Sequence, residues 1–227
     1  MWVCFYLLII LVIFSRTDNI AGWSNKTIYV LMGSVFLMSS IFGAFCMSLM
    51  EVPEQVRKGT LDFVITKPVD TQFWVSFRRF NFDKIGSMAV ALIMLIYGVV
   101  QSNVVIGPLQ WGGYVLQVFC AICIYYSLCL LMMTLSIYFV RIENLWVLSE
   151  TVLETARFPI DIYGPFAKQI LMFYVPIGLL ATAPASQLMQ GFQWQTIVAS
   201  VVWAGVSLLA TRYFWNFTLR RYTSASS

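Results

Sequence analysis

The sequence predicts an all-α membrane protein in which residues 1–227 form a single transmembrane domain of six helices. Hydrophobic residues make up 60% of the chain and charged residues only 11%, whereas soluble domains carry about 25% charged residues. A soluble fold of this size could not keep so much apolar surface away from water. The apolar residues are also gathered into long stretches, as membrane-spanning helices require.

Six apolar stretches mark the expected helices, and polar segments or segments with Gly and Pro separate them. Five stretches are long enough to cross the ~30 Å hydrocarbon core, which takes about 20 helical residues. The first stretch rises only ~21 Å as a helix, and it lacks the basic flank of a signal peptide. We therefore expect the first span to lack residues at its start. The stretches are residues 1–14, 27–50, 85–106, 114–140, 169–189 and 196–217.

The basic residues predict the orientation of the chain. If the spans alternate in direction, twelve basic residues fall on one side and two, Arg16 and Lys26, on the other. Basic residues concentrate in cytoplasmic segments, which predicts a multi-pass protein of the inner (plasma) membrane with both termini in the cytoplasm. Two long segments, residues 51–84 and 141–168, then lie on the cytoplasmic side. The basic residues of that side are Arg57, Lys58, Lys67, Arg78, Arg79, Lys84, Arg141, Arg157, Lys168, Arg212, Arg220 and Arg221.

Several function classes lack the residues that they need. The chain has no histidine, which removes the commonest general base and metal ligand. Cys120 and Cys123 form a C-x-x-C pair, but no second pair completes a zinc site. The sequence contains no G-x-x-x-x-G-K-[ST] motif to bind ATP, and no charged residue deep in the second to fifth stretches, where an ion-coupled carrier would need one. We expect no catalytic residue, metal or cofactor in this chain, and no nucleic-acid partner.

The first cytoplasmic segment begins with a pattern that predicts a short amphipathic helix. Apolar residues alternate with charged ones from residue 52, Gly59 interrupts the pattern, and Pro68 ends any helix at about Thr66. Its acidic and basic residues nearly balance, which favours docking to a protein over binding to an anionic lipid surface. The alternative is that these charges only solvate the loop.

The rest of this segment, residues 72–82, is aromatic and basic. Such a helix can lie in the membrane interface, with its rings at the acyl boundary and its guanidinium groups at lipid phosphates. We therefore predict that Trp74, Arg78 and Arg79 form a membrane-interface anchor. A plain juxtamembrane anchor fits the pattern equally well.

One motif resembles a known family. Residues 59–69 read GTLDFVITKPV, with acidic Glu51 and Glu54 before them and Arg78-Arg79-Phe80 after them. This pattern resembles the cytoplasmic signature of ABC-type exporter permeases of the type-2 family, and more narrowly the six-helix permeases long carried as a domain of unknown function. Residues 156–160, 174–178, 183–185 and 220–226 are similar to the same subfamily, so the resemblance covers the chain from residue 27 onward. Members usually begin with a basic amphipathic elbow helix, which is missing here.

The resemblance implies partners for the chain. In this family a coupling helix between the second and third spans sits in a groove of an ABC ATPase subunit, which itself binds ATP and Mg²⁺. Residues 51–66 would take that role, and a second permease subunit, identical or homologous, would complete the pathway in the lipid membrane. The second cytoplasmic segment is either a further contact or a helix extension. The predicted ATPase-coupling residues are Glu51, Glu54, Arg57, Lys58, Gly59, Asp62, Lys67 and Pro68.

The fifth stretch is crowded with the helix-breaking residues Pro176, Gly178 and Pro184. Each proline removes a backbone donor, and broken helices survive in membranes only where protein or a water-filled cavity satisfies the freed groups. The resemblance implies re-entrant elements at the outer mouth, between the fifth and sixth helices. We expect residues 181–190 to fold back as short helices lining a cavity; an ordinary Pro-kinked helix is the alternative.

Together these features predict the permease subunit of an ATP-binding cassette exporter, which moves a substrate with ATP hydrolysed by a separate subunit. A non-transporting membrane scaffold or assembly factor with the same fold is the alternative, and an ion-coupled carrier is a weaker one. The sequence does not name the substrate, although a path lined by Phe, Tyr, Met and Leu fits amphipathic or lipid-like cargo.

Overall fold

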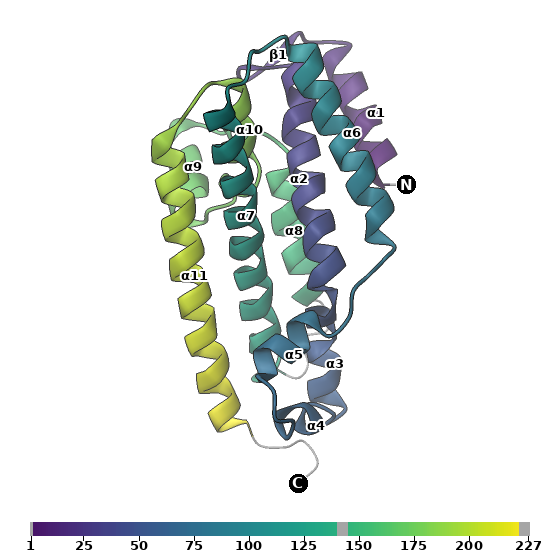
Figure 1. The fold of residues 1–227 in the computed structure, drawn as a ribbon, viewed down its shortest axis with the longest axis vertical. Helices are drawn as coiled ribbons and strands as arrows, with labels where there is room; N and C mark the ends of the chain where they lie inside the picture. The colour runs from purple at the N-terminus through teal and green to yellow at the C-terminus, as the bar shows by residue number, and fades with distance from the viewer. Residues whose placement is uncertain (1, 140–144, 223–227) are drawn as a thin grey trace.

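A computed structural model describes residues 2–139 and 145–222 as a bundle of helices with one short hairpin (Figure 1). Four helices of the described chain are long and apolar enough to cross a membrane. They coincide with the predicted second, third, fourth and sixth spans, and this part of the prediction is confirmed. These helices are α2 (Asn25–Phe45), α6 (Lys84–Ser102), α7 (Pro108–Leu135) and α11 (Trp194–Arg221).

The helices α2 and α7 form the centre of the bundle. In α2, 78% of the apolar stretch is buried within the protein and in α7 61%, against 22% in α6 and 17% in α11. The helix α6 packs against α2, and α11 packs against α7 on the other side of the bundle (Figure 1). The two outer helices therefore turn most of their apolar side chains outward, where a bilayer would cover them.

Two glycines let α2 and α6 approach each other closely. A Cβ atom added at Gly33 would lie 2.7 Å from the backbone nitrogen of Leu95, and one added at Gly98 would lie 2.8 Å from the backbone nitrogen of Val30. Small residues at such contacts let helix backbones pack directly where lipid tails provide no hydrophobic driving force. A side chain at either position would push the two helices apart.

A short hairpin closes one end of the bundle, which we name the hairpin end. The strand β1 (Asn19–Ile20) pairs antiparallel with β2 (Trp23–Ser24). The turn residues Ala21 and Gly22 have φ values of 50° and 91°, as two-residue hairpins of this kind require. The helix α1 (Trp2–Phe14), which has 13 residues, leads up to this hairpin, and Ser24 caps the start of α2 in a capping box.

Four short helices lie at the opposite end, which we name the α3–α5 end (Figure 1). The predicted amphipathic helix is present here as two pieces, with the break at Gly59 and the end at Thr66, where the sequence predicts them. Gly59 has a φ of 66°, a conformation that glycine adopts without strain. The four helices are η1 (Met47–Glu51), α3 (Val52–Arg57), α4 (Asp62–Ile65) and α5 (Thr71–Phe77).

Residues 169–189 do not form one helix. The helix α9 (Pro165–Gln169) continues into the π-helix η3 (Ile170–Tyr174), an irregular turn follows, and α10 (Thr182–Met189) begins after it. The predicted break in the fifth span is therefore confirmed. The short helix does not line an open cavity as expected, because residues 182–188 are all buried and α10 packs against α7 and α2.

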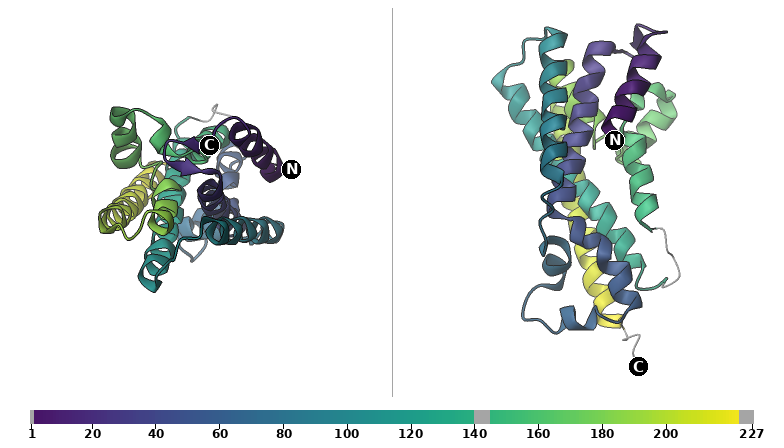
Figure 2. Two further views of the ribbon diagram at one scale, coloured as in Figure 1. Left: turned by 90° about the horizontal axis from the view of Figure 1, so that it is seen from above. Right: turned by 90° about the vertical axis from the view of Figure 1, so that its right-hand side faces the viewer.

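The prediction that residues 141–168 form a cytoplasmic segment is wrong for the described part. The helix α8 (Leu145–Ala156) packs against α7 and α2, and η2 (Ile160–Ile162) follows it at the hairpin end. There Trp23 Nε1 donates to Asp161 Oδ2 over 2.8 Å, and Lys168 Nζ lies 2.6 Å from Asp161 Oδ1. The chain thus returns toward the hairpin end through α8, beside α1 (Figure 2). The charged residues of α8 lower its hydropathy, which is why the apolar pattern missed it.

Candidate functional site

The outermost part of the α3–α5 end is formed by α3, α4 and the turn between them, residues 52–66, which we name the tip. Its apolar side chains Val56, Leu61 and Val64 are buried, and the turn is closed by a hydrogen bond from Thr60 N to Gln55 O of 2.9 Å. The predicted coupling residues Glu54, Arg57 and Lys58 are exposed, and Asp62 is half-buried. The tip is therefore a folded platform with charged groups on its outer face.

One exposed ion pair and one exposed ring mark that outer face. Lys58 Nζ lies 2.6 Å from Glu54 Oε1, one helical turn away, and its hydrogen bond holds the pKa of Glu54 below its usual value. Phe63 is 73% exposed at the start of α4. A large ring beside solvated charges is a typical anchor for a protein partner, because it buries much area at low entropic cost.

Glu51 joins the tip to the end of α5. Its carboxylate accepts hydrogen bonds from Arg78 NH2 and from Arg79 NH1, the latter over 2.9 Å. The Arg78 side chain is only 18% exposed, and with the Gln55 amide turned to satisfy its surroundings, the amide oxygen also accepts from Arg78 NH2 at 2.8 Å. Burial lowers the pKa of this guanidinium.

The predicted membrane anchor is divided by this arrangement. Arg78 pairs with Glu51 and its side chain is 18% exposed, whereas the Arg79 side chain remains 70% exposed; the anchoring of these residues in a membrane stays a prediction. Trp74 carries Lys67 Nζ over its ring, 3.7 Å from the centroid, so two further predicted residues meet each other. The neighbouring Pro68 is exposed. The exposed aromatic rings of this segment are Phe73, Phe77, Phe80 and Phe82.

Asp70 and Arg212 tie α5 to α11, a contact that the sequence did not reveal. Arg212 NH1 donates to Asp70 Oδ1 over 2.9 Å, and Arg212 NH2 donates to Oδ2, which makes the pair bidentate. Asp70 also caps α5 by accepting from Phe73 N at 2.9 Å. The hydrogen bonds from Arg212 hold the pKa of Asp70 below its usual value.

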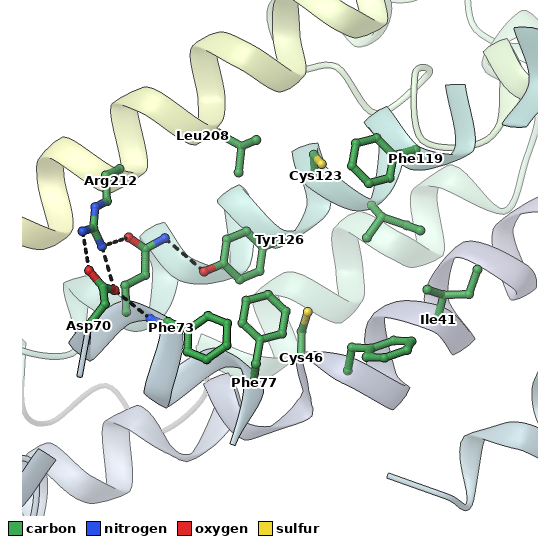
Figure 3. Close-up of a pocket in the computed structure, with 13 residues that line it drawn as sticks. Ile41, Cys46, Asp70, Phe73, Phe77, Phe119, Cys123, Tyr126, Leu208 and Arg212 are labelled. Carbon is green, nitrogen blue, oxygen red and sulfur yellow. Dashed lines mark hydrogen bonds and ion pairs between the residues drawn. The ribbon is translucent and has the colours of Figure 1, made fainter. Parts of the chain in front are cut away.

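The same cluster continues to α7 through Gln72. Arg212 NH1 also donates to Gln72 Oε1 over 2.9 Å, while Gln72 Nε2 donates to Tyr126 OH over 3.0 Å. Ser76 Oγ lies 2.8 Å from the same hydroxyl. As Figure 3 shows, Asp70, Arg212 and the Tyr126 hydroxyl lie at one end of a pocket of about 630 Å³ whose other lining residues are mostly apolar. The first turn of α5 is thus bonded to both α7 and α11.

Of the predicted outer-mouth residues, Pro176 and Gly178 lie in the turn between η3 and α10, and Pro184 lies in α10 itself. Pro176 follows Val175, which ends the π-helix, as expected for the residue before a proline. A Cβ added at Gly178 would lie 2.5 Å from Ile160 Cδ1, so this glycine allows a close approach of two segments. Pro184 lies in the first turn of α10, where its missing N–H leaves no helical bond broken.

A second cavity, of about 480 Å³, lies between α2, α8 and the start of α6. Its wall contains four charged side chains, Lys84, Glu150, Glu154 and Arg157, together with hydroxyl and aromatic groups. We name it the charged cavity. These residues lie outside the apolar stretches, so the lack of charge deep in the second to fifth stretches does not extend to the whole interior of the bundle. The signal was in the sequence as the i, i+4, i+7 spacing of Glu150, Glu154 and Arg157, which puts two residues of α8 and the residue after it on one helical face.

Arg157 is the most buried of these charged groups, with 7% of its surface exposed. Its NH1 donates to Tyr6 OH over 2.5 Å, and the guanidinium carbon lies 4.4 Å from the centroid of that ring. The Phe36 ring, in the middle of α2, lies 5.7 Å away. Ionisable groups buried among membrane-spanning helices are costly and most often mark a substrate or ion path.

Comparison with known proteins connects this architecture to one family. A family model described as "ABC-2 family transporter protein" matches residues 1–226. A search of curated proteins gave no significant match. The family match spans nearly the whole chain and agrees with the long apolar helices that the structure contains. The chain therefore belongs to the ABC-2 transporter family and is a membrane permease of that family, a transport component and not itself a catalyst.

Proposed function

We propose that the chain is the permease subunit of an ATP-driven exporter and that a separate ABC ATPase docks at the tip. The family implies association with an ABC ATPase. In this proposal the ATPase binds ATP and Mg²⁺, the α3–α5 end faces the cytoplasm, and a second permease subunit completes the pathway across the plasma membrane. The charged outer face of the tip and the exposed Phe63 ring are the surface that the ATPase would contact.

The observation that carries this proposal is that the segment around α5, which follows the tip directly in the chain, is bonded to three long helices at once. Asp70 connects α5 to α11, and Tyr126 connects it to α7, as described above. The end of the segment is attached to α2, because Asn81 N donates to Ala44 O over 2.9 Å. Arg79 N donates to Ser48 Oγ over 3.2 Å in the adjoining η1. A load applied at the tip would therefore reach α2, α7 and α11 together.

This arrangement supports a mechanical coupling between ATP hydrolysis and transport. Closure of two ATPases on ATP would move the two tips, and each tip would carry its attached helices with it. Packed interfaces of this kind respond as units, since they are bistable and not continuously deformable. The charged cavity lies beside α2, one of the moved helices, so its access would change in the same step.

The experiment uses the full chain, affinity-purified in mild detergent from its native membrane, with ATP hydrolysis measured in the eluate. We expect hydrolysis to accompany the wild-type chain and to be lost when Glu54→Lys or Asp62→Lys reverses a charge of the tip. The matched control is Arg16→Glu, which reverses an exposed charge at the hairpin end and should leave ATP hydrolysis in the eluate at the wild-type level.

Two results would contradict the proposal. Equal hydrolysis in all eluates would place the docking surface away from the tip. Absence of any ATPase from the wild-type eluate would favour the alternative of a membrane scaffold.

A further inference from the structure

The charged cavity contains two acidic and two basic side chains, so its formal charge is zero. Lys84 stands at the start of α6, while Glu150, Glu154 and Arg157 lie along one face of α8 and the residue that follows it. A ligand with a single charge would be attracted by one pair and repelled by the other. A ligand that carries both charges matches both pairs, so the wall favours a zwitterion.

The guanidinium of Arg157 has bonding capacity left inside the protein. Its Nε is buried and has no hydrogen-bond partner among the described residues. The nearest carboxylate atom, Glu154 Oε1, is 3.9 Å from NH1, which is too far for a hydrogen bond. A buried cation is costly unless it is paired and fully hydrogen-bonded. The site therefore lacks an oxyanion that would complete it.

Lys84 and Glu150 stand in the same wall but do not form an ion pair with each other. The Lys84 stem crosses Gly43, because a Cβ there would lie 2.9 Å from Lys84 Cε. Within the described ranges, no ion pair within 4.0 Å joins Lys84 or Glu150 to another side chain. The glycine thus makes room for a lysine that reaches the cavity and remains free to bind a ligand.

The aromatic groups decide which cation the site can take. Quaternary ammonium groups are usually held over aromatic faces, but of the three rings in the wall Phe36 is engaged by Arg157, and Phe42 and Tyr125 pack edge to face against each other. The carboxylates of Glu150 and Glu154 remain, and they accept hydrogen bonds, which a primary ammonium can donate and a quaternary ammonium cannot. The cavity therefore favours a primary ammonium.

We propose that the charged cavity binds a zwitterionic amphiphile, with its primary ammonium on Glu150 and Glu154 and its oxyanion on Arg157 and Lys84. This inference rests on the proposed function, because it names the class of cargo that the permease would carry. The apolar walls formed by Phe42 and Leu153 extend the site for the attached chain. The shared chemistry is a primary ammonium near an oxyanion, on a lipid or on a free molecule.

The test measures binding to the full chain, purified in detergent without any ATPase, by its thermal unfolding midpoint and by native mass spectrometry. The probes are dioctanoyl-phosphatidylethanolamine, the anionic dioctanoyl-phosphatidylglycerol, the quaternary dioctanoyl-phosphatidylcholine, and free phosphoethanolamine. We expect the ethanolamine lipid to bind at least tenfold more tightly than the other two lipids. Free phosphoethanolamine binding as tightly would assign the site to a soluble zwitterion, and much weaker binding would assign it to a lipid.

Variants test which groups hold the two charges. The double variant Glu150→Gln/Glu154→Gln leaves two unopposed cations, so the preference should invert toward the glycerol lipid. Lys84→Gln should weaken the binding of every phosphate-bearing probe and leave the buried Arg157 in place. Asp18→Asn, an exposed acid at the hairpin end, is the control and should bind as the wild type does.

Three results would overturn the inference: no binding by any ethanolamine probe, equal or tighter binding of the glycerol or choline lipid, or an unchanged preference in the double variant. Because no ATPase is present, this failure is distinct from that of the proposed function. Loss of binding selectivity with intact ATPase association would contradict the inference alone.

Discussion

The bond between Asp70 and Arg212 allows the mechanical role of α5 to be separated from its contribution to stability. Asp70 carries two functions, since it pairs with Arg212 and caps α5 at Phe73 N. Asp70→Asn removes the charge but keeps a side chain that caps helices equally well. Arg212→Gln removes the other charge, and the two changes together complete a double-mutant cycle.

The structure indicates a small loss of stability. The two side chains are 44% and 43% exposed, and exposed ion pairs contribute only about 0.2–1 kcal/mol. The bidentate geometry places this pair toward the upper part of that range. A loss of 1 kcal/mol lowers the unfolding midpoint of a chain of this size by about 2–4 °C. Asp70→Ala would also lose the cap and cost about 0.5–2 kcal/mol more.

The expected effect on coupling is much larger. If α5 moves α11 through this bond, Asp70→Asn and Arg212→Gln should each abolish the stimulation of ATP hydrolysis by cargo or lipid, and the double variant should be no worse than either. The matched control is Lys168→Gln, which removes an ion pair at the hairpin end with a side chain that is 47% exposed. It should lower the midpoint by a similar amount and leave the coupling intact.

The pH dependence gives an independent check of the same pair. The hydrogen bonds from Arg212 hold the pKa of Asp70 below its usual value of about 3.9. The stability from the pair is therefore fully present above that usual value and is lost as the pH falls through the lowered one. The difference in the free energy of unfolding between wild type and Asp70→Asn should stay constant from pH 8 to about pH 5.

Wild-type coupling in both single variants, or additive losses of coupling in the double variant, would refute the mechanical role of the Asp70–Arg212 pair.

Two further predictions concern packing and orientation. Gly98→Ala should lower the unfolding midpoint, because backbone overlap with Val30 costs about 1–3 kcal/mol and exceeds a helix-propensity gain of up to ~1 kcal/mol. At Gly86, in the same helix, an added Cβ meets open space, so Gly86→Ala should leave the unfolding midpoint unchanged or raise it. An equal change of the midpoint in both variants would contradict the close contact between Gly98 and Val30. Single cysteines at Val105 and Phe63, which are 94% and 73% exposed, should be labelled from outside and from inside the cell, respectively, by an impermeant thiol reagent. The opposite pattern would invert the proposed orientation.

The sequence predicted elements whose signals are local and continuous. The helices α2, α6, α7 and α11 each contain a long, predominantly apolar stretch, and the length of that stretch indicates a membrane span. The tip was also predicted closely, because Gly59 breaks the helix through its positive φ and Pro68 prevents it from continuing. In both cases the information lies within a few residues of the feature that it determines.

Features that depend on distant residues could not be predicted in this way. Asp70 and Arg212 are separated by 142 positions, and nothing in either neighbourhood indicates the other. The pairing of Arg78 with Glu51 depends on how α5 folds back on η1. The role of the tip in docking an ATPase stays a prediction, as does the presence of a second permease.

The helix α8 shows why a charged segment can be both invisible to hydropathy and central to the transporter. Leu145, Ser149 and Leu153 form a buried stripe against the bundle, whereas Glu150 and Glu154 lie on the neighbouring face, in the wall of the cavity. Such a helix cannot be stable alone in lipid, because its charges would be unpaired there. It is held in place by α2 and α7. A helix too polar for lipid but packed within a membrane bundle has a polar face that protein groups, water or a polar ligand must satisfy, and this requirement is the physical reason for the ligand site that we propose beside α8.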